Sequence, residues 1–434
     1  MISNFDDHFK KLLKNLNSNN KFILGLSGGT DSMALLHLIK NYIDNKRNIP
    51  ISCVPIIIDH NLRDESEIES KEVKKISQNL GFDTQIKKIN LSKPSGNIQN
   101  WARKQRRNLL FQKCLELSAN LILGHHFDDQ AETLFMRFSR GSALDGLLGM
   151  NEISSWKGVF IIRPLMSYTK EQIKNYVRNK KIYYFEDSSN NNDKFERVKT
   201  RFYLNHIKKT VWPNISNDLN YFSNLNSSLL NKTNYYFSSW SANNILIHEG
   251  GAIRVNYESL RYIFEKSFLF TIRIVGKIIQ TVGGNEYAPK RKKTYNLISF
   301  MFTKNFKKKS LGNVNIFLSQ GNLFFIRENR NLNFGVNIQK NKYYIFDGRF
   351  IVKSPLAGKL VKCTNSDLSV IDITSPFNKY SYLINNTIPY LETLEGETIK
   401  PHLFIINQNS KLNEIGRAHV RTPVTSQSRM PSSA

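Results

Sequence analysis

The sequence predicts an α/β protein whose N-terminal part is a Rossmann-like, doubly wound parallel sheet. Short apolar runs alternate with longer segments of helical spacing, and strands that alternate with helices form βαβ units. Such units place parallel strands side by side and cover both faces of the sheet with helices. The predicted strands are residues 21–26, 51–59, 83–89 and 120–124, and the predicted helices are 31–45, 64–80, 97–118 and one that follows residue 127.

The rest of the chain predicts two further domains, because 434 residues exceed one typical hydrophobic core. Residues 215–335 show helical spacing with aromatics among cations, and they close with a hairpin signal at Gly321-Asn322. We therefore predict an N-terminal domain over 1–214, a mainly helical middle domain over 215–335 and a small β-rich C-terminal domain over 340–413. Residues 414–434 lack periodicity and resemble a translated sequencing adapter. We treat them as a non-native tail and expect the C-terminal domain to be incomplete.

The composition is strongly basic, with 62 Lys and Arg against 35 Asp and Glu and a formal net charge of +27. A polyanionic partner such as nucleic acid would account for this excess. A solvated basic surface or the residue bias of an AT-rich genome would also account for it, so charge alone decides nothing. There is no apolar run of about 18 residues, which predicts a protein without membrane spans. Three distant cysteines, Cys53, Cys114 and Cys363, form no disulfide or metal pattern and predict a cytoplasmic location.

A glycine loop, residues 27–32, joins the first predicted strand to the first predicted helix. Its two glycines allow backbone N–H groups to turn inward, and the helix adds the positive end of its dipole, so the loop suits phosphate groups. A Walker loop would require a Lys that this segment lacks. An ordinary turn of small residues is the plain alternative. The predicted ATP ligands of this loop are Ser27, Gly28, Gly29, Thr30, Asp31 and Ser32, with Asp31 also the candidate Mg²⁺ ligand.

Polar residues also follow the second and fourth predicted strands. Ligands of open α/β sheets bind beyond the carboxyl ends of the strands, so Ser27, Asp59 and His125 should share one edge. Asp59 is a candidate ligand of ribose or Mg²⁺. Asp129 and Glu132 lie three residues apart on one helical face, so their carboxylates should converge and could bind an ammonium group or Mg²⁺. Zinc is a poorer fit, because no helical His pair and no third distant ligand motif accompany them.

Several cationic segments are candidates for nucleic-acid contacts. Arg103 and Arg106 belong to residues 101–107 of a predicted helix; this segment has four cations, one or two of which should face a nucleotide. Arg197 and Arg201 lie one helical turn apart, a spacing suited to a phosphate backbone. The densest basic clusters of the middle region are residues 290–293 and Lys304 with residues 307–309. The predicted RNA contacts are Arg197, Arg201, Lys290, Arg291, Lys292 and Lys293.

Together these segments resemble the tRNA(Ile)-lysidine synthetase family of the PP-loop ATP-pyrophosphatase superfamily over roughly residues 20–215. The chain departs from the family at Arg107, where a Tyr is usual, and residues 340–413 match poorly. The motifs that carry the resemblance are Ser27-Gly-Gly-Thr-Asp-Ser32, Asp59-His-Asn-Leu-Arg63, Ala102-Arg103 with Arg106, Gly124-His-His-Phe-Asp-Asp-Gln-Ala-Glu132-Thr, Arg140-Gly-Ser142 and Asp187 through Arg201.

The resemblance implies a two-step reaction on the isoleucine tRNA with a CAU anticodon. ATP adenylates C2 of the wobble cytidine, position 34, and releases pyrophosphate; the ε-amine of free L-lysine then displaces AMP to give lysidine. Asp129 and Glu132 would bind lysine, and Mg²⁺ would accompany ATP. Asp31, Arg103, Arg106 and His125 would be catalytic, His125 either by orienting substrate or by taking a proton from the amine.

Three other functions stay open. A tRNA sulfurtransferase of the same superfamily would need a nucleophilic cysteine pair or a cysteine-bound cluster, whereas Cys53 and Cys114 are expected in the core. An adenylating enzyme with a small substrate would not explain the basic middle region. A nonenzymatic RNA-binding protein would not need intact Ser27, Asp31 and Ser32. The sequence gives no evidence on oligomeric state, so a homodimer stays possible.

Overall fold

The computed structural model divides into two compact units, Met1–Lys232 and Thr233–Ala434, each of which is described by itself. It describes residues 4–16, 20–45, 48–59, 65–89, 98–142, 144–156, 159–186, 196–362, 376–399 and 402–405. The predicted segments 60–63 and 187–195, Cys363 and the predicted tail lie outside these residues. The finer division of the chain at residues 214 and 335–340 stays a prediction.

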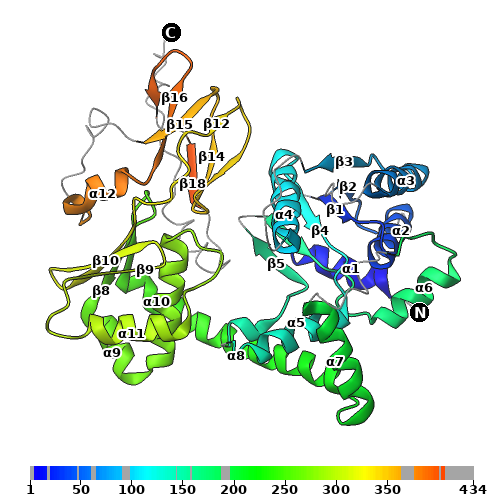
Figure 1. The fold of residues 1–434 in the computed structure, drawn as a ribbon, viewed down its shortest axis with the longest axis horizontal. Coiled ribbons are helices and arrows are strands. Elements are labelled where there is room, and N and C mark those ends of the chain that lie inside the picture. The colour runs from blue at the N-terminus through cyan, green and yellow to red at the C-terminus, as the bar shows by residue number, and fades with distance from the viewer. Residues whose placement is uncertain are drawn as a thin grey trace, which may run out of the picture. The chain divides into compact units, whose positions relative to one another are not determined.

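The first unit contains the predicted α/β sheet, which has six strands in the order β3-β2-β1-β4-β6-β5 (Figure 1). All neighbours pair in parallel except β5 and β6, which form an antiparallel hairpin that we did not predict. Continuous burial of β1 after its first residue is typical of a central parallel strand. The strands are β1 Lys21–Leu26, β2 Ser52–Asp59, β3 Gln85–Lys88, β4 Asn120–Ile122, β5 Ile153–Trp156 and β6 Val159–Ile162.

Helices cover both faces of this sheet, as predicted. Phe22 and Leu24 of β1 belong to a core cluster with α1, α2 and α6, whereas a side chain at Gly25 would point at Leu110 of α4. The helices are α1 Phe5–Lys14, α2 Thr30–Asp44, α3 Glu65–Asn79, α4 Ile98–Glu116, α5 Phe127–Ser139, α6 Lys170–Asn179 and α7 Glu196–Thr210. In the described part of the chain, no helix is long and apolar enough to cross a membrane.

The helical middle region is confirmed, and it also contains a five-stranded antiparallel sheet, β7-β8-β11-β10-β9. The predicted hairpin is β10–β11, where Gln320 and Gly321 both have positive φ, as a type I′ turn requires. The helices are α8 Ile215–Asn244, α9 Tyr257–Lys266, α10 Phe268–Val282 and α11 Arg291–Met301. The strands are β7 Ile245–Ile247, β8 Ile253–Asn256, β9 Lys308–Leu311, β10 Val314–Ser319 and β11 Asn322–Arg327.

The C-terminal region is β-rich, as predicted, and forms two small sheets, β12-β15-β16-β17 and β13-β14-β18. Within the described residues of this region, the α-helix α12 Ser381–Asn385 precedes β16. The strands are β12 Asn337–Ile338, β13 Tyr344–Phe346, β14 Phe350–Lys353, β15 Gly358–Lys362, β16 Pro389–Thr393, β17 Thr398–Ile399 and β18 His402–Ile405.

A buried ionic cluster joins the middle and C-terminal regions of the second unit. The carboxylate of Asp347 accepts hydrogen bonds from Arg327, with Nε–Oδ2 2.8 Å and Nη2–Oδ1 2.9 Å, and from Nε of Arg349 at 2.8 Å. Burial lowers the pKa of Arg349 to about 10, although Asp347 opposes the shift. Phe324 and Phe377 meet edge-to-face in the core cluster beside it.

Candidate active site

The glycine loop is held in shape by its own hydrogen bonds. The hydroxyl of Ser32 accepts from Ser27 N at 3.3 Å and from Ser27 Oγ at 3.1 Å, and it donates to Gly29 O at 3.0 Å. Gly28 has a φ of +81°, and a β-carbon there would lie 2.7 Å from Val73 Cγ2, so both backbone and space require glycine. Gly29 is the N-cap of α2 and offers no side chain to the first N–H groups of that helix. These donors suit a phosphate.

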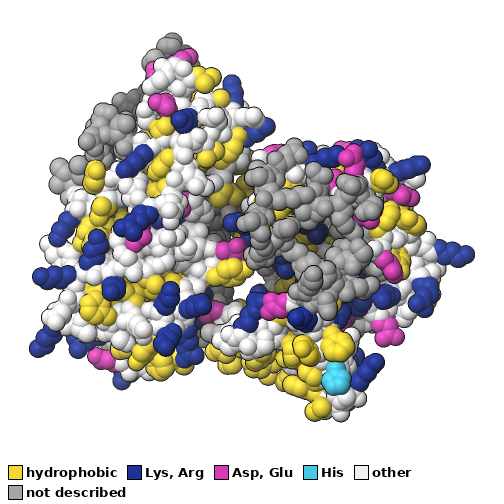
Figure 2. Space-filling view, in the orientation of Figure 1, with side chains coloured by type: hydrophobic (Ala, Val, Ile, Leu, Met, Phe, Trp, Pro, Cys, Tyr) yellow, Lys and Arg dark blue, Asp and Glu magenta, His cyan; other side chains and the backbone are white. Residues whose placement is uncertain are grey.

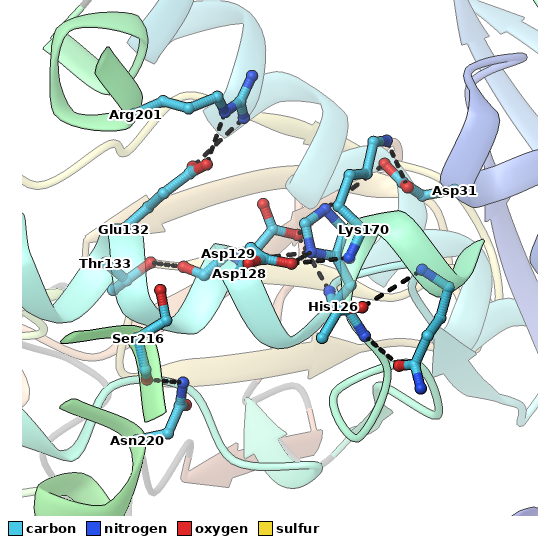
Figure 3. Close-up of polar contacts among 12 residues, drawn as sticks. Asp31, His126, Asp128, Asp129, Glu132, Thr133, Lys170, Arg201, Ser216 and Asn220 are labelled. Carbon is cyan, nitrogen blue, oxygen red and sulfur yellow. Dashed lines mark hydrogen bonds and ion pairs between the residues drawn. The ribbon is translucent and has the colours of Figure 1, made fainter. Parts of the chain in front are cut away.

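Asp31, the predicted Mg²⁺ ligand, forms an ion pair in this structure. Its Oδ1 lies 2.6 Å from Nζ of Lys170, the first residue of α6 (Figure 3). The backbone N–H of Lys170 donates to Asp128 Oδ2 at 2.7 Å, which anchors the start of α6 beside α5. Sequence reasoning missed Lys170. The only local signal was the capping box of Thr169 and Gln172, which marks the beginning of a helix but not what its first side chain contacts.

His126 lies between the glycine loop and the acid pair. Its side chain is buried, and its Nε2 is 3.8 Å from Asp31 Oδ2 and 3.6 Å from Asp129 Oδ2. His126 is also the N-cap of α5, where it and Asp129 form a reciprocal capping box. From the sequence we predicted His125 and not His126. Both residues follow β4, and their spacing alone does not show which of them contacts the acids.

His125 is held as a neutral imidazole. Burial, with a further contribution from Arg163, lowers its pKa to about 3, although Asp129 opposes the shift. Its Nδ1 is buried and has no hydrogen-bond partner among the described residues. A group this weakly basic is a poor proton acceptor at neutral pH, so of its two predicted roles this environment favours orienting a substrate.

The carboxylates of Asp129 and Glu132 converge, as their spacing predicts, and arginines contact both. Arg197 donates from Nη2 to Asp129 Oδ1 and from Nε to Glu132 Oε2, each at 2.7 Å. Arg201 Nε lies 2.7 Å from Glu132 Oε1 (Figure 3). Burial raises the pKa of Asp129, but His126 and Arg197 outweigh it and hold that pKa below its ordinary value. Arg197 and Arg201, which we predicted as RNA contacts, therefore neutralise the acid pair in this structure.

The other predicted residues fall into two groups. Asp59 ends β2 beside β1, is buried and accepts a hydrogen bond from Ser66 Oγ at 2.8 Å. Arg103 and Arg106 belong to α4 of the same unit, and burial, together with Arg103, lowers the pKa of Arg106. Lys290 and its three neighbours, in contrast, lie exposed at the start of α11 in the second unit.

Two further residues bear on the alternatives. The guanidinium of Arg107, where the resembling family usually has Tyr, stacks 4.7 Å above the Trp156 ring, which gives this departure a structural role. Cys53 and Cys114 are free thiols, and burial raises the pKa of each to about 12. Such thiols are not nucleophilic, which counts against sulfur transfer through them. Within the described residues, no three His, Cys, Asp or Glu side chains are grouped to hold a metal.

A parallel sheet with a phosphate-type glycine loop after its first strand defines a PP-loop protein. The family model described as a PP-loop domain matches residues 1–207. The tRNA(Ile)-lysidine synthase of Wolbachia sp. subsp. Brugia malayi is 32% identical over 292 residues, which cover 66% of this chain and 64% of the relative. That of Wolbachia pipientis wMel is 30% identical over 347 residues, covering 76% of each chain. The chain belongs to the tRNA(Ile)-lysidine synthase family.

Among solved structures, the U34-tRNA thiolase NcsA from Methanococcus maripaludis is similar at 20% identity and a TM-score of 0.44, over 53% of this chain and 80% of that one. This likeness is too low to support an argument about function. The chain spans about two thirds of the length of the first Wolbachia relative and three quarters of the second.

Proposed function

We propose that this protein ligates free L-lysine to C2 of the wobble cytidine, position 34, of the CAU-anticodon isoleucine tRNA, with ATP cleaved to AMP and pyrophosphate. One observation supports this most directly. The glycine loop and the acid pair are linked through His126, whose Nε2 is within 4 Å of a carboxylate of each. A phosphate site and an ammonium site this close suit a reaction that activates one substrate with ATP and then adds an amine.

ATP would bind with its phosphates against the N–H groups of the glycine loop and the start of α2. The Asp31 carboxylate and the ATP phosphates are oxygen ligands of the kind that Mg²⁺ prefers, so the residues fit this ion. Bound Mg²⁺ would neutralise charge that develops on the pyrophosphate. Lys170 would then leave Asp31 or contact the phosphates itself, because its ammonium lies where such a cation would sit.

In the first step the O2 oxygen of cytidine attacks the α-phosphate, an O–P bond forms and pyrophosphate leaves. In the second step the neutral ε-amine of lysine attacks C2, and AMP leaves with the O2 oxygen. Arg103 and Arg106, on α4, would steady the base and its adenylate. Neutral His125 would orient the substrate by a hydrogen bond.

Asp129 and Glu132 would hold an ammonium group of lysine. Arg197 occupies both carboxylates in this structure, with two contacts of 2.7 Å, so lysine would have to take over bonds that the guanidinium now makes. Released arginines would then be free to meet a tRNA phosphate, which is compatible with the RNA contacts predicted for Arg197 and Arg201.

For tRNA binding, the basic composition and the exposed cluster of residues 290–293 are the supporting observations. Figure 2 shows many Lys and Arg side chains on the visible face and far fewer Asp and Glu. Cations of this density bind phosphate backbones by releasing counterions. We place the reaction in the cytoplasm, and a homodimer stays a prediction that the site does not require.

Incubation with ATP, radiolabelled lysine and the CAU isoleucine tRNA tests the proposal. We expect label that survives mild alkaline deacylation and migrates with a modified cytidine after digestion to nucleosides. Label that is lost on deacylation, as expected for an ester at the 3′ end, would contradict it. A transcript with uridine at position 34 is the matched control and should remain unlabelled.

A further inference from the structure

Four strands of the first sheet end at the same edge, and a polar residue stands at each end. β2 ends with Asp59, β1 is followed by Ser27, β4 leads to His125, and β6 is followed directly by Arg163. Three of these positions already belong to the proposed site. Arg163 has no role in it so far, although this edge is where open α/β sheets bind their ligands.

The strand register fixes Arg163 beside the segment that carries His125. β4 and β6 are parallel, with Ile122 opposite Ile162. The ladder continues beyond the strands, since Leu123 N donates to Ile162 O at 2.9 Å. The chain therefore leaves both strands in the same direction, and Arg163 and His125 lie on neighbouring segments of the edge.

Among the described residues, the guanidinium of Arg163 has only neutral hydrogen-bond partners. Its Nη1 donates to Asn151 O at 2.7 Å and to Ser154 Oγ at 2.9 Å, and its Nε is buried with no partner among the described residues. No carboxylate in the described part of the chain forms an ion pair with it. The adjacent acid, Glu152, instead lies 3.0 Å from His8 Nε2.

The surroundings of Arg163 are positive. Burial and the nearby charge of Arg103 lower its pKa to about 10, which still leaves it protonated at neutral pH. His125 is neutral and supplies no counter-charge. A half-buried cation without an anion is unfavourable, and a ligand that brings negative charge removes this cost. The environment of Arg163 therefore favours an anion as its partner.

We propose that Arg163 binds a phosphate group of a nucleotide substrate at this edge of the sheet. The inference rests on the proposed function, which brings two nucleotides here. The phosphate is therefore either the α-phosphate of ATP or a backbone phosphate beside the target cytidine. A guanidinium suits both, because its planar donors pair with two phosphate oxygens at once.

The experiment compares Arg163→Gln, Arg163→Lys and Ser154→Ala by calorimetric titration with Mg²⁺-ATP and by filter binding of tRNA at several salt concentrations. If ATP supplies the phosphate, Arg163→Gln weakens ATP binding about ten- to hundredfold, the range of one charge-assisted contact, and leaves tRNA binding unchanged. If the RNA backbone supplies it, tRNA binding weakens, and its logarithmic salt slope falls by about one.

Ser154→Ala is the matched control, since it removes a neutral partner of the guanidinium but keeps its charge. It should bind both ligands like the wild type. The proposal is overturned if Arg163→Gln binds both ligands normally. It is also overturned if Ser154→Ala weakens binding as much as Arg163→Gln does, because Arg163 would then serve only to stabilise the β5–β6 hairpin. Should Arg163→Gln not fold, Arg163→Met takes its place under the same criteria. Arg163→Lys keeps the charge but loses the paired donors, so it should bind with an affinity between those of the wild type and the uncharged variant. These affinities do not depend on lysine transfer, so a failure of the proposed reaction stays distinguishable.

Discussion

The ammonium group of Lys170 lies 2.6 Å from Asp31 Oδ1, and so the first residue of α6 neutralises the acid of the glycine loop. The two residues are 139 positions apart in the chain. Both side chains are about one third exposed, so the pair contributes at most about 1 kcal/mol to stability. We therefore expect this ion pair to affect ligand binding more than the stability of the fold.

We predict that Lys170→Met weakens ATP binding about tenfold or more while the melting temperature changes little. The reason is that, if Mg²⁺ binds Asp31 as proposed, the ammonium group of Lys170 would be free to contact the ATP phosphates. Calorimetric titration with ATP measures this affinity. Lys174→Met, on an exposed position of the same helix, should bind ATP normally.

Asp31→Ala should abolish tRNA-dependent ATP/pyrophosphate exchange and leave tRNA binding unchanged. Undiminished exchange in this variant would exclude Asp31 from the ATP site.

Glu132→Gln should raise the KM for lysine strongly and leave ATP/pyrophosphate exchange largely intact, because the acid pair is assigned to the second step. It should also cost roughly 1–3 kcal/mol of stability, since a buried carboxylate that neutralises two arginines is lost. Steady-state kinetics and urea denaturation test both effects. Glu196→Gln, which breaks an exposed pair with Arg140, is the control and should be near neutral in both.

The pH dependence of stability should reveal His125. Its pKa is lowered from 6.5 to about 3 in the folded protein. Between these two pH values His125 is therefore protonated in the unfolded chain and neutral in the folded chain. Stability from this residue is therefore complete above pH 6.5 and is lost as the pH falls toward 3, by about 1 kcal/mol per pH unit. Urea denaturation at pH 7, 6 and 5 should give a smaller slope for His125→Asn. His206→Asn, at an exposed position, should keep the wild-type slope.

Charge reversal of Lys290, Arg291, Lys292 and Lys293 should raise the KM for tRNA and flatten its salt dependence, because fewer counterions are released on binding. Kinetics at three or more salt concentrations measure this. Reversal of the exposed Lys11 and Lys14 of α1 serves as the control and should change the tRNA KM far less per charge. Identical behaviour of the two variants would mean that net charge matters and the cluster itself does not.

The sequence predicted the first sheet closely, because its central strand is buried without interruption and the helix after it has clear periodicity. β1 matches the prediction at both ends, and α2 begins one residue earlier than predicted. The β5–β6 hairpin was missed, since β5 has only half-buried residues and no alternation. Local spacing also predicted that Asp129 and Glu132 converge. It could not predict that Arg197 faces them, because periodicity assigns a side chain to a helix face and does not identify the partner across it.

The carboxylate of Asp347 has a consequence for shortened forms of this chain. It forms ion pairs with Arg327, at the end of β11, and with Arg349, two residues after Asp347. All three side chains are nearly inaccessible to solvent. A premature stop or frameshift before residue 340 would remove Asp347 and also Phe377 and Tyr380, which cover Phe324 of β11. Arg327 would lose its carboxylate partner, and the loss of one partner of a buried pair costs about 3–5 kcal/mol. We therefore expect such a lesion to unfold the basic middle region as well, and not merely to remove a dispensable appendage.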